Sequence, residues 1–304
     1  MWYTILYVIK VYKLNRDLVH ATERTAIQRL AAALALPSFD KGWVWLAGAG
    51  PGDPGLITAL GLFAIANADA ILYDALIDTS LLRFARPGAA LIFAGKRAGK
   101  RSCKQADISR TLVSLAKKGG RVLRLKGGDP MVFGRGAEEA LTLARAGVPF
   151  RIVPGVTAGI GGLAYAGIPV SHRDTNHVVT FLTGHGADGK LPKLDWQAIA
   201  RGSPTLVLYM ARKYAGEIAA KLIAAGRDPQ EPAAVVSNAS LPDQDVRVTT
   251  LAGLGDAAAE STAPAILVVG ENVGLRAGMD WLGAMAGKEL DAALPEKAAL
   301  CNAG

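Results

Sequence analysis

Two glycine-rich segments of this chain combine backbone freedom with charged side chains that could do chemistry. The first is G-A-G-P-G-D at residues 48–53, and the second is K-G-G-D-P-M-V-F-G-R-G at residues 126–136. Glycine lets backbone amides and carbonyls approach a ligand closely, while proline restricts the turns around it. Each segment follows a short apolar run and precedes a helical pattern. Because loops at the carboxyl ends of parallel strands bind ligands in open α/β sheets, we predict one pocket lined by both segments.

Strand-like and helix-like segments alternate through the first half of the chain, which predicts a parallel sheet with helices on both faces. The predicted strands are 44–47, 70–74, 90–94, 121–125 and 149–153, and the predicted helices lie near 56–67, 80–85, 106–118 and 137–146. The second half offers strands at 178–183, 205–210, 233–237, 245–250 and 265–270. The run V-R-V-T-T follows the loop N-A-S-L-P-D-Q and should pair with A-A-V-V-S as a hairpin, so this second sheet should be mixed.

These patterns predict an α/β protein with two domains, 42–156 and 157–275, that meet over a cleft. Residues 1–41 are expected to form a peripheral or poorly ordered extension, and residues 276–304 a tail with helical character. The apolar start M-W-Y-T-I-L-Y-V-I is too short to span a bilayer and lacks the basic residues that normally precede the apolar part of a signal sequence. An anchor on a membrane surface is the less favoured alternative, and we expect no membrane partner.

The chain is basic, with a formal net charge of +8 at pH 7 and a pI near 9.5. Many of its basic residues fall in predicted loops, namely Lys96, Arg97, Lys100, Arg101, Lys104, Arg124, Lys126, Arg135, Arg173, Arg212 and Lys213. This charge suits an anionic substrate with several carboxylates, since guanidinium groups bind carboxylates bidentately. A solvated surface and a nucleic-acid partner are the alternatives. Only 6% of the residues are aromatic, however, and they do not alternate with basic residues, so nucleic acid is not expected.

Neither the cysteines nor the histidines have the spacing of a metal site. Cys103 and Cys301 are the only cysteines and lie far apart in the sequence, so we expect neither a disulfide framework nor a structural zinc site. A reducing cytoplasm is the simplest compartment for such a chain. The four histidines form no H-x-x-x-H pair that could hold a metal on one helix face. We therefore predict no metal.

The first glycine-rich loop invites comparison with a dinucleotide-binding fingerprint. Gly48 and Gly50 follow a strand, and Asp74 ends the next strand at nearly the distance expected of a ribose ligand. The third glycine of G-x-G-x-x-G is missing, because Asp53 occupies its position. Prolines at 51 and 54 also disturb the helix start that would hold a pyrophosphate. An NAD-dependent enzyme is therefore only the alternative.

The two loops occur together with further motifs: Y-D-A-L-I at 73–77, G-K-R-A-G at 95–99, V-P-G-V-T-A at 153–158, G-I-P-V-S-H-R-D at 167–174 and L-Y-M at 208–210. In this order, from about residue 42 to about 275, they resemble the tetrapyrrole methyltransferase family. Within it, G-G-D-P-x-x-F-G-R-G-x-E-E is most similar to members that methylate uroporphyrinogen III. The resemblance implies the two-domain tetrapyrrole methylase fold, with a parallel amino-terminal sheet, a mixed carboxyl-terminal sheet and the active site in the interdomain cleft.

The same resemblance implies a reaction and an assembly. S-adenosylmethionine would methylate uroporphyrinogen III at C2 and C7, giving precorrin-2 through precorrin-1, for sirohaem or cobalamin biosynthesis. No metal would be needed, and the enzyme would be a homodimer. The chain is expected to be a stand-alone methyltransferase, without a fused dehydrogenase and ferrochelatase module. A protein that binds tetrapyrroles or RNA without turnover is the alternative from another class.

Residue roles also follow from the resemblance. The positions matching the cofactor site are Pro51, Gly127, Gly128, Asp129, Val132, Thr157, Ala158, Met210 and Ala239. Asp74 matches a proton acceptor and Lys96 a proton donor, and the candidates for substrate binding are Arg135, Arg173 and His172. By residue type alone, Asp74 could instead cap a helix, and Lys96 could anchor a substrate carboxylate or be a surface charge. Core packing is the alternative for Val132, Ala158 and Met210, and many family members have glycine at the position of Ala239.

Overall fold

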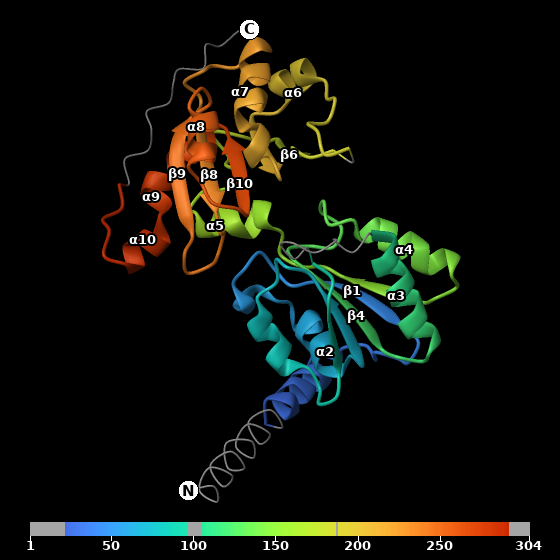
Figure 1. The fold of residues 1–304 in the computed structure, drawn as a ribbon. Coiled ribbons are helices and arrows are strands. Elements are labelled where there is room, and N and C mark those ends of the chain that lie inside the picture. Colours follow the sequence, from blue (N-terminus) through green and yellow to red (C-terminus); the bar gives the residue numbers. More distant parts are fainter. Residues whose placement is uncertain (1–21, 96–104, 187, 292–304) are drawn as a thin grey trace, which may run out of the picture. The chain divides into compact units, whose positions relative to one another are not determined.

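The computed structural model describes residues 22–95, 105–186 and 188–291. These residues belong to two compact units, of which the first ends at Val156 and the second begins at Thr157 (Figure 1). Each unit is built around a five-stranded sheet. Lys96 lies outside the described residues, as do Cys103 and Cys301.

The first unit contains a wholly parallel sheet in the order β3-β2-β4-β1-β5, which confirms the predicted arrangement. Its strands are β1 (Val44–Gly48), β2 (Ala70–Tyr73), β3 (Ala90–Phe93), β4 (Val122–Lys126) and β5 (Phe150–Val153). The connecting helices are η1 (Pro54–Leu56), α2 (Ala59–Asn67), η2 (Thr79–Phe84), α3 (Gln105–Lys117) and α4 (Gly136–Arg145). The chain at 80–85, predicted as an ordinary helix, is the tighter 3₁₀ form in η2.

Helices cover both faces of this sheet, and strand β1 shows why (Figure 1). Successive residues of a strand point to opposite faces. Trp45 and Ala47 accordingly pack in a cluster with residues of α2, whereas Val44 and Leu46 pack in another with residues of α3 and α4. An unbroken apolar run therefore suits a strand that is buried on both sides.

Part of the predicted extension contributes to the core of the first unit. Residues 22–33 are helical, and Ile27 and Ala31 on that helix are buried in the same cluster as Trp45. Phe39 stacks on Trp45 with ring centroids 4.4 Å apart and an interplanar angle of 20°. Aromatic burial of this kind stabilises a fold substantially. Residues 22–39 therefore contribute three buried side chains to this core, while most of their other side chains stay exposed.

The second unit contains a mixed sheet in the order β6-β7-β10-β8-β9. Its strands are β6 (Val179–Thr183), β7 (Thr205–Tyr209), β8 (Pro232–Ser237), β9 (Asp245–Thr250) and β10 (Ala265–Val269). Only β6 and β7 pair in parallel, and the β8–β9 hairpin predicted from the sequence is present with Pro232 opposite Thr250. The helices are η3 (Ala158–Gly162), α5 (Leu163–Tyr165), α6 (Trp196–Gly202), η4 (Arg212–Tyr214), α7 (Ala215–Ala224), α8 (Leu254–Ala259), η5 (Glu271–Leu275), α9 (Arg276–Met279) and α10 (Trp281–Met285).

In the part of the chain that the structure describes, no helix combines the length and the apolar character needed to cross a bilayer.

Candidate functional site

Three loops meet at the carboxyl edge of the first sheet, after β1, β4 and β5. Gly50 and Gly128 form an antiparallel bridge, in which the Gly128 amide donates to the Gly50 carbonyl at 2.7 Å and the Gly50 amide donates in return at 3.3 Å. A Cβ atom on Gly48 or on Gly155 would lie 2.3 Å from the Gly128 carbonyl oxygen. No side chain fits at that distance, so these glycines are required by close packing of backbone on backbone. The two glycine-rich loops therefore contact each other, and the pocket lined by both stays a prediction.

The Asp129 side chain connects two of these loops through hydrogen bonds. Its Oδ2 accepts a hydrogen bond from the Gly155 amide at 2.9 Å, and its Oδ1 accepts one from the Met131 amide at 2.7 Å. A carboxylate has further lone pairs after two such bonds, so it can still face a cationic ligand group. Asp129 consequently orders the loop besides its predicted role at the cofactor.

The loop between β4 and α4 is strained and presents apolar side chains to solvent. Phe133 and Arg135 have positive φ angles of 50° and 59°. Such conformations cost energy for residues with a Cβ, and they cluster at ligand sites. Met131 is 48% exposed and Phe133 38% exposed, while Val132 is half-buried. A strained loop with exposed apolar side chains indicates a surface that a ligand covers.

A cluster of charged side chains lies beside this loop. Arg124 and Lys126, on the same face of β4, meet Glu139 of α4 and Asp74, which follows β2. Arg124 Nη2 donates to Asp74 Oδ1 at 2.5 Å, and its Nε donates to Glu139 Oε1 at 3.1 Å. Lys126 Nζ lies 3.5 Å from Glu139 Oε1 and 3.8 Å from Asp74 Oδ2. We call these four residues the charge cluster.

The charge cluster is buried, with Asp74 as its most accessible member. The side chains of Arg124 and Glu139 are 2% and 0% exposed, whereas that of Asp74 is 26% exposed. Burial lowers the pKa of Lys126 below its ordinary value of 10.5, and the positive charge of Arg124 lowers it further, against the opposing effect of Glu139 and Asp74. Ligands could therefore reach the Asp74 carboxylate while its partners stay out of water.

The sequence patterns did not predict this cluster. We grouped Arg124 and Lys126 with the basic loop residues, and that was wrong, since both are buried in the central strand of the first sheet. The available signal was the alternation V-L-R-L-K, because two cations at alternate positions of an apolar strand must share one face. Glu139 gave no such signal, since its neighbour Glu138 is exposed on the same helix.

In the second unit, four of the predicted cofactor residues lie around the end of β7. The Tyr209 hydroxyl lies 2.8 Å from Thr157 Oγ1 and accepts a hydrogen bond from the Gly159 amide at 2.8 Å. This bond holds the start of η3, which begins at Ala158 and has the π-helical form often found at functional sites. Met210, the residue after β7, is 51% exposed with a positive φ of 53°. Ala239 packs against Gly162 of η3, so closely that a Cβ atom on Gly162 would lie 2.6 Å from the Ala239 methyl group.

The three predicted substrate-binding residues lie on two segments: Arg135 belongs to the strained loop before α4, whereas His172 and Arg173 lie on the segment before β6. His172 forms a β-bridge with Asn176, and the Asn176 side chain donates a hydrogen bond to Thr205, the first residue of β7. Met210 lies at the opposite end of this strand, after its last residue. Arg173 is exposed on the same segment. Arg135 is exposed and forms a bidentate pair with Glu138 at 2.9 and 2.7 Å. Among residues 22–95, 105–186 and 188–291, no three His, Cys, Asp or Glu side chains lie close enough to hold a metal ion.

Comparisons with known proteins indicate the family of this chain. The sequence pattern of the family described as Tetrapyrrole (Corrin/Porphyrin) Methylases matches residues 44–255. A uroporphyrinogen-III C-methyltransferase of Sinorhizobium sp is 62% identical over 260 residues, covering 84% of this chain and 93% of that protein. A siroheme synthase of Neisseria meningitidis is 46% identical over 272 residues, which are 90% of this chain. The chain spans only 56% of that relative.

The solved structures that resemble this chain include two methyltransferases that act on tetrapyrroles. A uroporphyrin-III C-methyl transferase from Thermus thermophilus, complexed with S-adenyl homocysteine, superposes with a TM-score of 0.67 at 40% identity. That match covers 76% of this chain and 98% of the solved one. A cobalt precorrin-4 methyltransferase superposes with a TM-score of 0.69 at 28% identity, over 78% of this chain and 98% of the other.

Proposed function

The chain belongs to the tetrapyrrole (corrin/porphyrin) methylase family, and from this premise we propose that it methylates uroporphyrinogen III with S-adenosylmethionine, first at C2 and then at C7. The product would be precorrin-2, formed through precorrin-1, for sirohaem or cobalamin biosynthesis. The observation that carries the proposal is the 62% identity to a uroporphyrinogen-III C-methyltransferase over 93% of that protein. Siroheme synthases match this chain over about half their own length. Their similarity therefore supports a role of this chain in the same pathway, but it does not extend to all activities of a siroheme synthase.

The loops of both units support S-adenosylmethionine as the methyl donor. Backbone amides and carbonyls of Gly127 and Gly128 can approach a ligand without side-chain obstruction, beside Pro51 and Asp129. The second unit offers the exposed Met210 side chain next to the ordered start of η3 at Thr157 and Ala158. When bound, the donor supplies an electrophilic methyl group on a sulfonium, and the Thermus relative was solved with the demethylated product of such a donor.

The charge cluster supports Asp74 as the proton acceptor. Attack by a pyrrole carbon becomes easier as the pyrrole loses a proton, so a carboxylate near the ring assists the reaction. Arg124 holds Asp74 Oδ1 through a charge-assisted bond and thereby orients the other oxygen. Asp74 also keeps partial access to solvent, which a group that contacts substrate requires. Arg124 is thus a positioning residue in this proposal.

Lys96 is proposed as the proton donor, with anchoring of a substrate carboxylate as its alternative role. The substitutions Lys96→Arg and Lys96→Ala separate the two. An anchor should tolerate arginine and should mainly raise the substrate KM when alanine replaces it. A donor should lose turnover with either substitution.

We further propose that the enzyme acts as a homodimer in the cytoplasm, on a small tetrapyrrole and without a nucleic-acid or membrane partner. The family resemblance supports the dimer, and the small number of cysteines supports a reducing compartment. Arg135, Arg173 and His172 are proposed to bind the carboxylates of the substrate. Sedimentation at working concentration checks the dimer, and a monomer would contradict it.

The decisive experiment incubates the full chain with S-adenosylmethionine and enzymatically generated uroporphyrinogen III, followed by mass spectrometry. We expect a product heavier by two methyl groups. The absence of that product would overturn the proposed reaction. Calorimetry with S-adenosylhomocysteine is the companion measurement, because a protein that only sequesters tetrapyrroles or binds RNA would show no affinity for it.

A further inference from the structure

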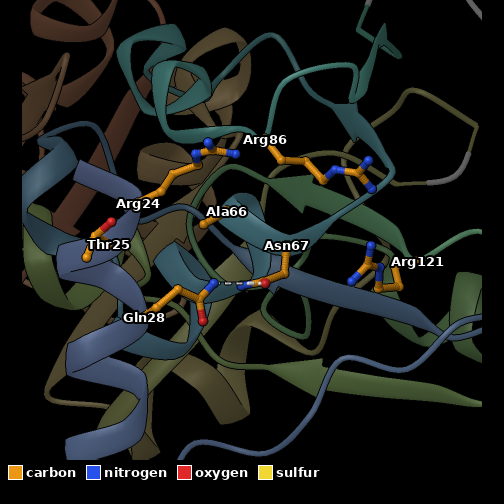
Figure 2. Close-up of a pocket in the computed structure, with 7 residues that line it drawn as sticks. All are labelled: Arg24, Thr25, Gln28, Ala66, Asn67, Arg86 and Arg121. Atoms are coloured by element: carbon orange, nitrogen blue, oxygen red, sulfur yellow. Dashed lines mark hydrogen bonds between the residues drawn. The ribbon is translucent and has the colours of Figure 1, made fainter. Parts of the chain in front are cut away.

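Three arginines line a cavity at the amino edge of the first sheet, away from the glycine-rich loops. The cavity measures about 470 Å³ and receives Arg24 from the helix at 22–33, Arg86 from the segment before β3 and Arg121 from the residue before β4 (Figure 2). Since the strands of this sheet are parallel, their amino ends lie at the edge opposite to the carboxyl ends that carry the proposed methylation site. The two sites are therefore separate within the first unit.

Asp69 is the acidic residue paired with two of these arginines, and its bonding capacity is filled. It accepts from Arg86 Nη1, from the Arg121 amide at 2.8 Å, from Arg121 Nε at 3.0 Å and from Arg121 Nη2 at 3.0 Å. An ionised carboxylate has about four acceptor sites, so Asp69 cannot also serve Arg24. Three arginines thus line the cavity, and one carboxylate, that of Asp69, pairs with two of them.

Arg24 is the arginine whose Nε receives no acceptor from the described part of the chain. Its Nε is buried and has no hydrogen-bond partner among the residues that the structure describes. An exposed arginine is satisfied by water, whereas a buried donor without a partner costs free energy. The backbone that carries Arg24 is held in place, because Gln28 on the same helix donates to Asn67 at the end of α2 at 3.0 Å (Figure 2). The missing acceptor is the feature that an anion would supply.

The cavity lining determines what kind of anion fits. Apart from the arginines it contains Thr25, Gln28 and Asn67, with Ala66 as its one apolar residue. Its volume is within the range of about 300–1,000 Å³ common to small-molecule sites. Guanidinium groups bind phosphates and carboxylates through paired hydrogen bonds, and converging positive charges in a concave site concentrate anions. We propose that this cavity binds a small, multiply charged oxyanion that carries phosphate or carboxylate groups.

The test is calorimetric titration of the full chain with pyrophosphate and with citrate, at an ionic strength held constant with sodium chloride. We expect saturable binding of at least one probe, and the stronger of the two identifies phosphate or carboxylate as the preferred group. Arg24→Gln and Arg86→Gln should each weaken that binding about tenfold or more, the scale for losing a charge-assisted hydrogen bond. The matched control is Arg29→Gln, which removes the same charge from an exposed position of the same helix and should change Kd by less than about twofold.

Three results would overturn the proposal. The first is no saturable binding of either probe. The second is equal weakening by Arg29→Gln and Arg24→Gln, which would mean a diffuse effect of surface charge. The third is displacement of the probe by a single-stranded oligonucleotide that binds more tightly through the same arginines, since the site would then serve an extended polyanion. Circular dichroism of each variant verifies its fold and keeps this test independent of the proposed methylation.

Discussion

The carboxyl ends of β4 and β7 lie in different units and are built from different side chains. Beside β4, four charged groups pair with one another, and two of them, Arg124 and Glu139, are almost fully buried. At the end of β7, a neutral hydroxyl pair, Tyr209 with Thr157, organises the backbone. Buried charges depend on their partners far more than neutral groups do. The first unit therefore depends on buried charge pairs beside β4, whereas the second orders its backbone at β7 through a neutral hydroxyl pair.

The largest effect is expected from breaking the charge cluster. Arg124→Met removes one charged hydrogen-bond partner of Glu139 and leaves that buried carboxylate with Gln105 Nε2 at 2.8 Å and Lys126 Nζ at 3.5 Å. Such a change should destabilise the first unit by about 3–5 kcal/mol. Urea unfolding followed by circular dichroism measures the loss. The double variant Arg124→Met/Glu139→Leu should recover much of it, and failure to recover would mean that packing, not charge, makes Arg124 necessary.

Asp74→Asn tests the catalytic part of the same cluster. The amide keeps the shape of the side chain but cannot accept a proton as a carboxylate does, so turnover should fall about a hundredfold or more. Affinity for S-adenosylhomocysteine should remain within about twofold, since little of the cofactor site depends on this residue. The exposed Asp40→Asn is the control for charge alone. Normal turnover in Asp74→Asn would remove Asp74 as the base.

Gly155→Ala tests the loop contacts of the first unit. The new methyl group would lie 2.3 Å from the Gly128 carbonyl oxygen and would force the second glycine-rich loop to move. We expect affinity for S-adenosylhomocysteine to fall about tenfold, on the scale of a lost hydrogen bond or a displaced loop. Gly202→Ala is the matched control, because its Cβ would meet nothing within 4 Å. Equal affinities in the two variants would show that this loop does not contact the cofactor.

Tyr209→Phe tests the neutral hydroxyl pair of the second unit and should have a smaller effect than the three changes in the first unit. It removes a hydroxyl that bonds Thr157 Oγ1 and the Gly159 amide, at a cost of about 1 kcal/mol in stability. Cofactor affinity should fall a few-fold because the start of η3 loosens. Tyr214→Phe removes a comparable bond, to the Gly189 carbonyl at 2.7 Å, and should leave cofactor affinity unchanged. A loss of affinity in both variants would contradict a local role for Tyr209.

The smallest expected effect is a dependence of the unfolding free energy on pH. The lowered pKa of Lys126 means that the unfolded chain binds its proton more tightly than the folded protein does. Stability from this residue should therefore rise with pH between the lowered folded-state pKa and the ordinary value of 10.5. Urea unfolding of the wild type and of Lys126→Met across the alkaline range measures it. The difference in unfolding free energy, wild type minus variant, should increase with pH, and a flat difference would contradict the shift.

Much of this architecture was predictable because its signals are local. Apolar runs such as V-W-L-A and turn residues such as those of the 48–53 loop report secondary structure without knowledge of distant neighbours. The β8–β9 hairpin followed from one turn-rich loop between two strand-like runs. Candidate site residues came from motif resemblance, and Asp74, Asp129 and Met210 occupy strand ends where such residues can meet a ligand.

Local patterns in the sequence therefore indicated which segments form strands and helices, the family, and the positions of the glycine-rich loops. Tertiary structure alone decided which charges are buried. Arg124 and Lys126 became interior residues because Glu139, supplied by α4, and Asp74, supplied after β2, neutralise them there. It also decided that Phe39 packs on Trp45. The charge pairing depends on contacts between residues 15 and 50 positions apart in the sequence. Local propensity contains no information about the partner that offsets a desolvated charge or covers an aromatic ring.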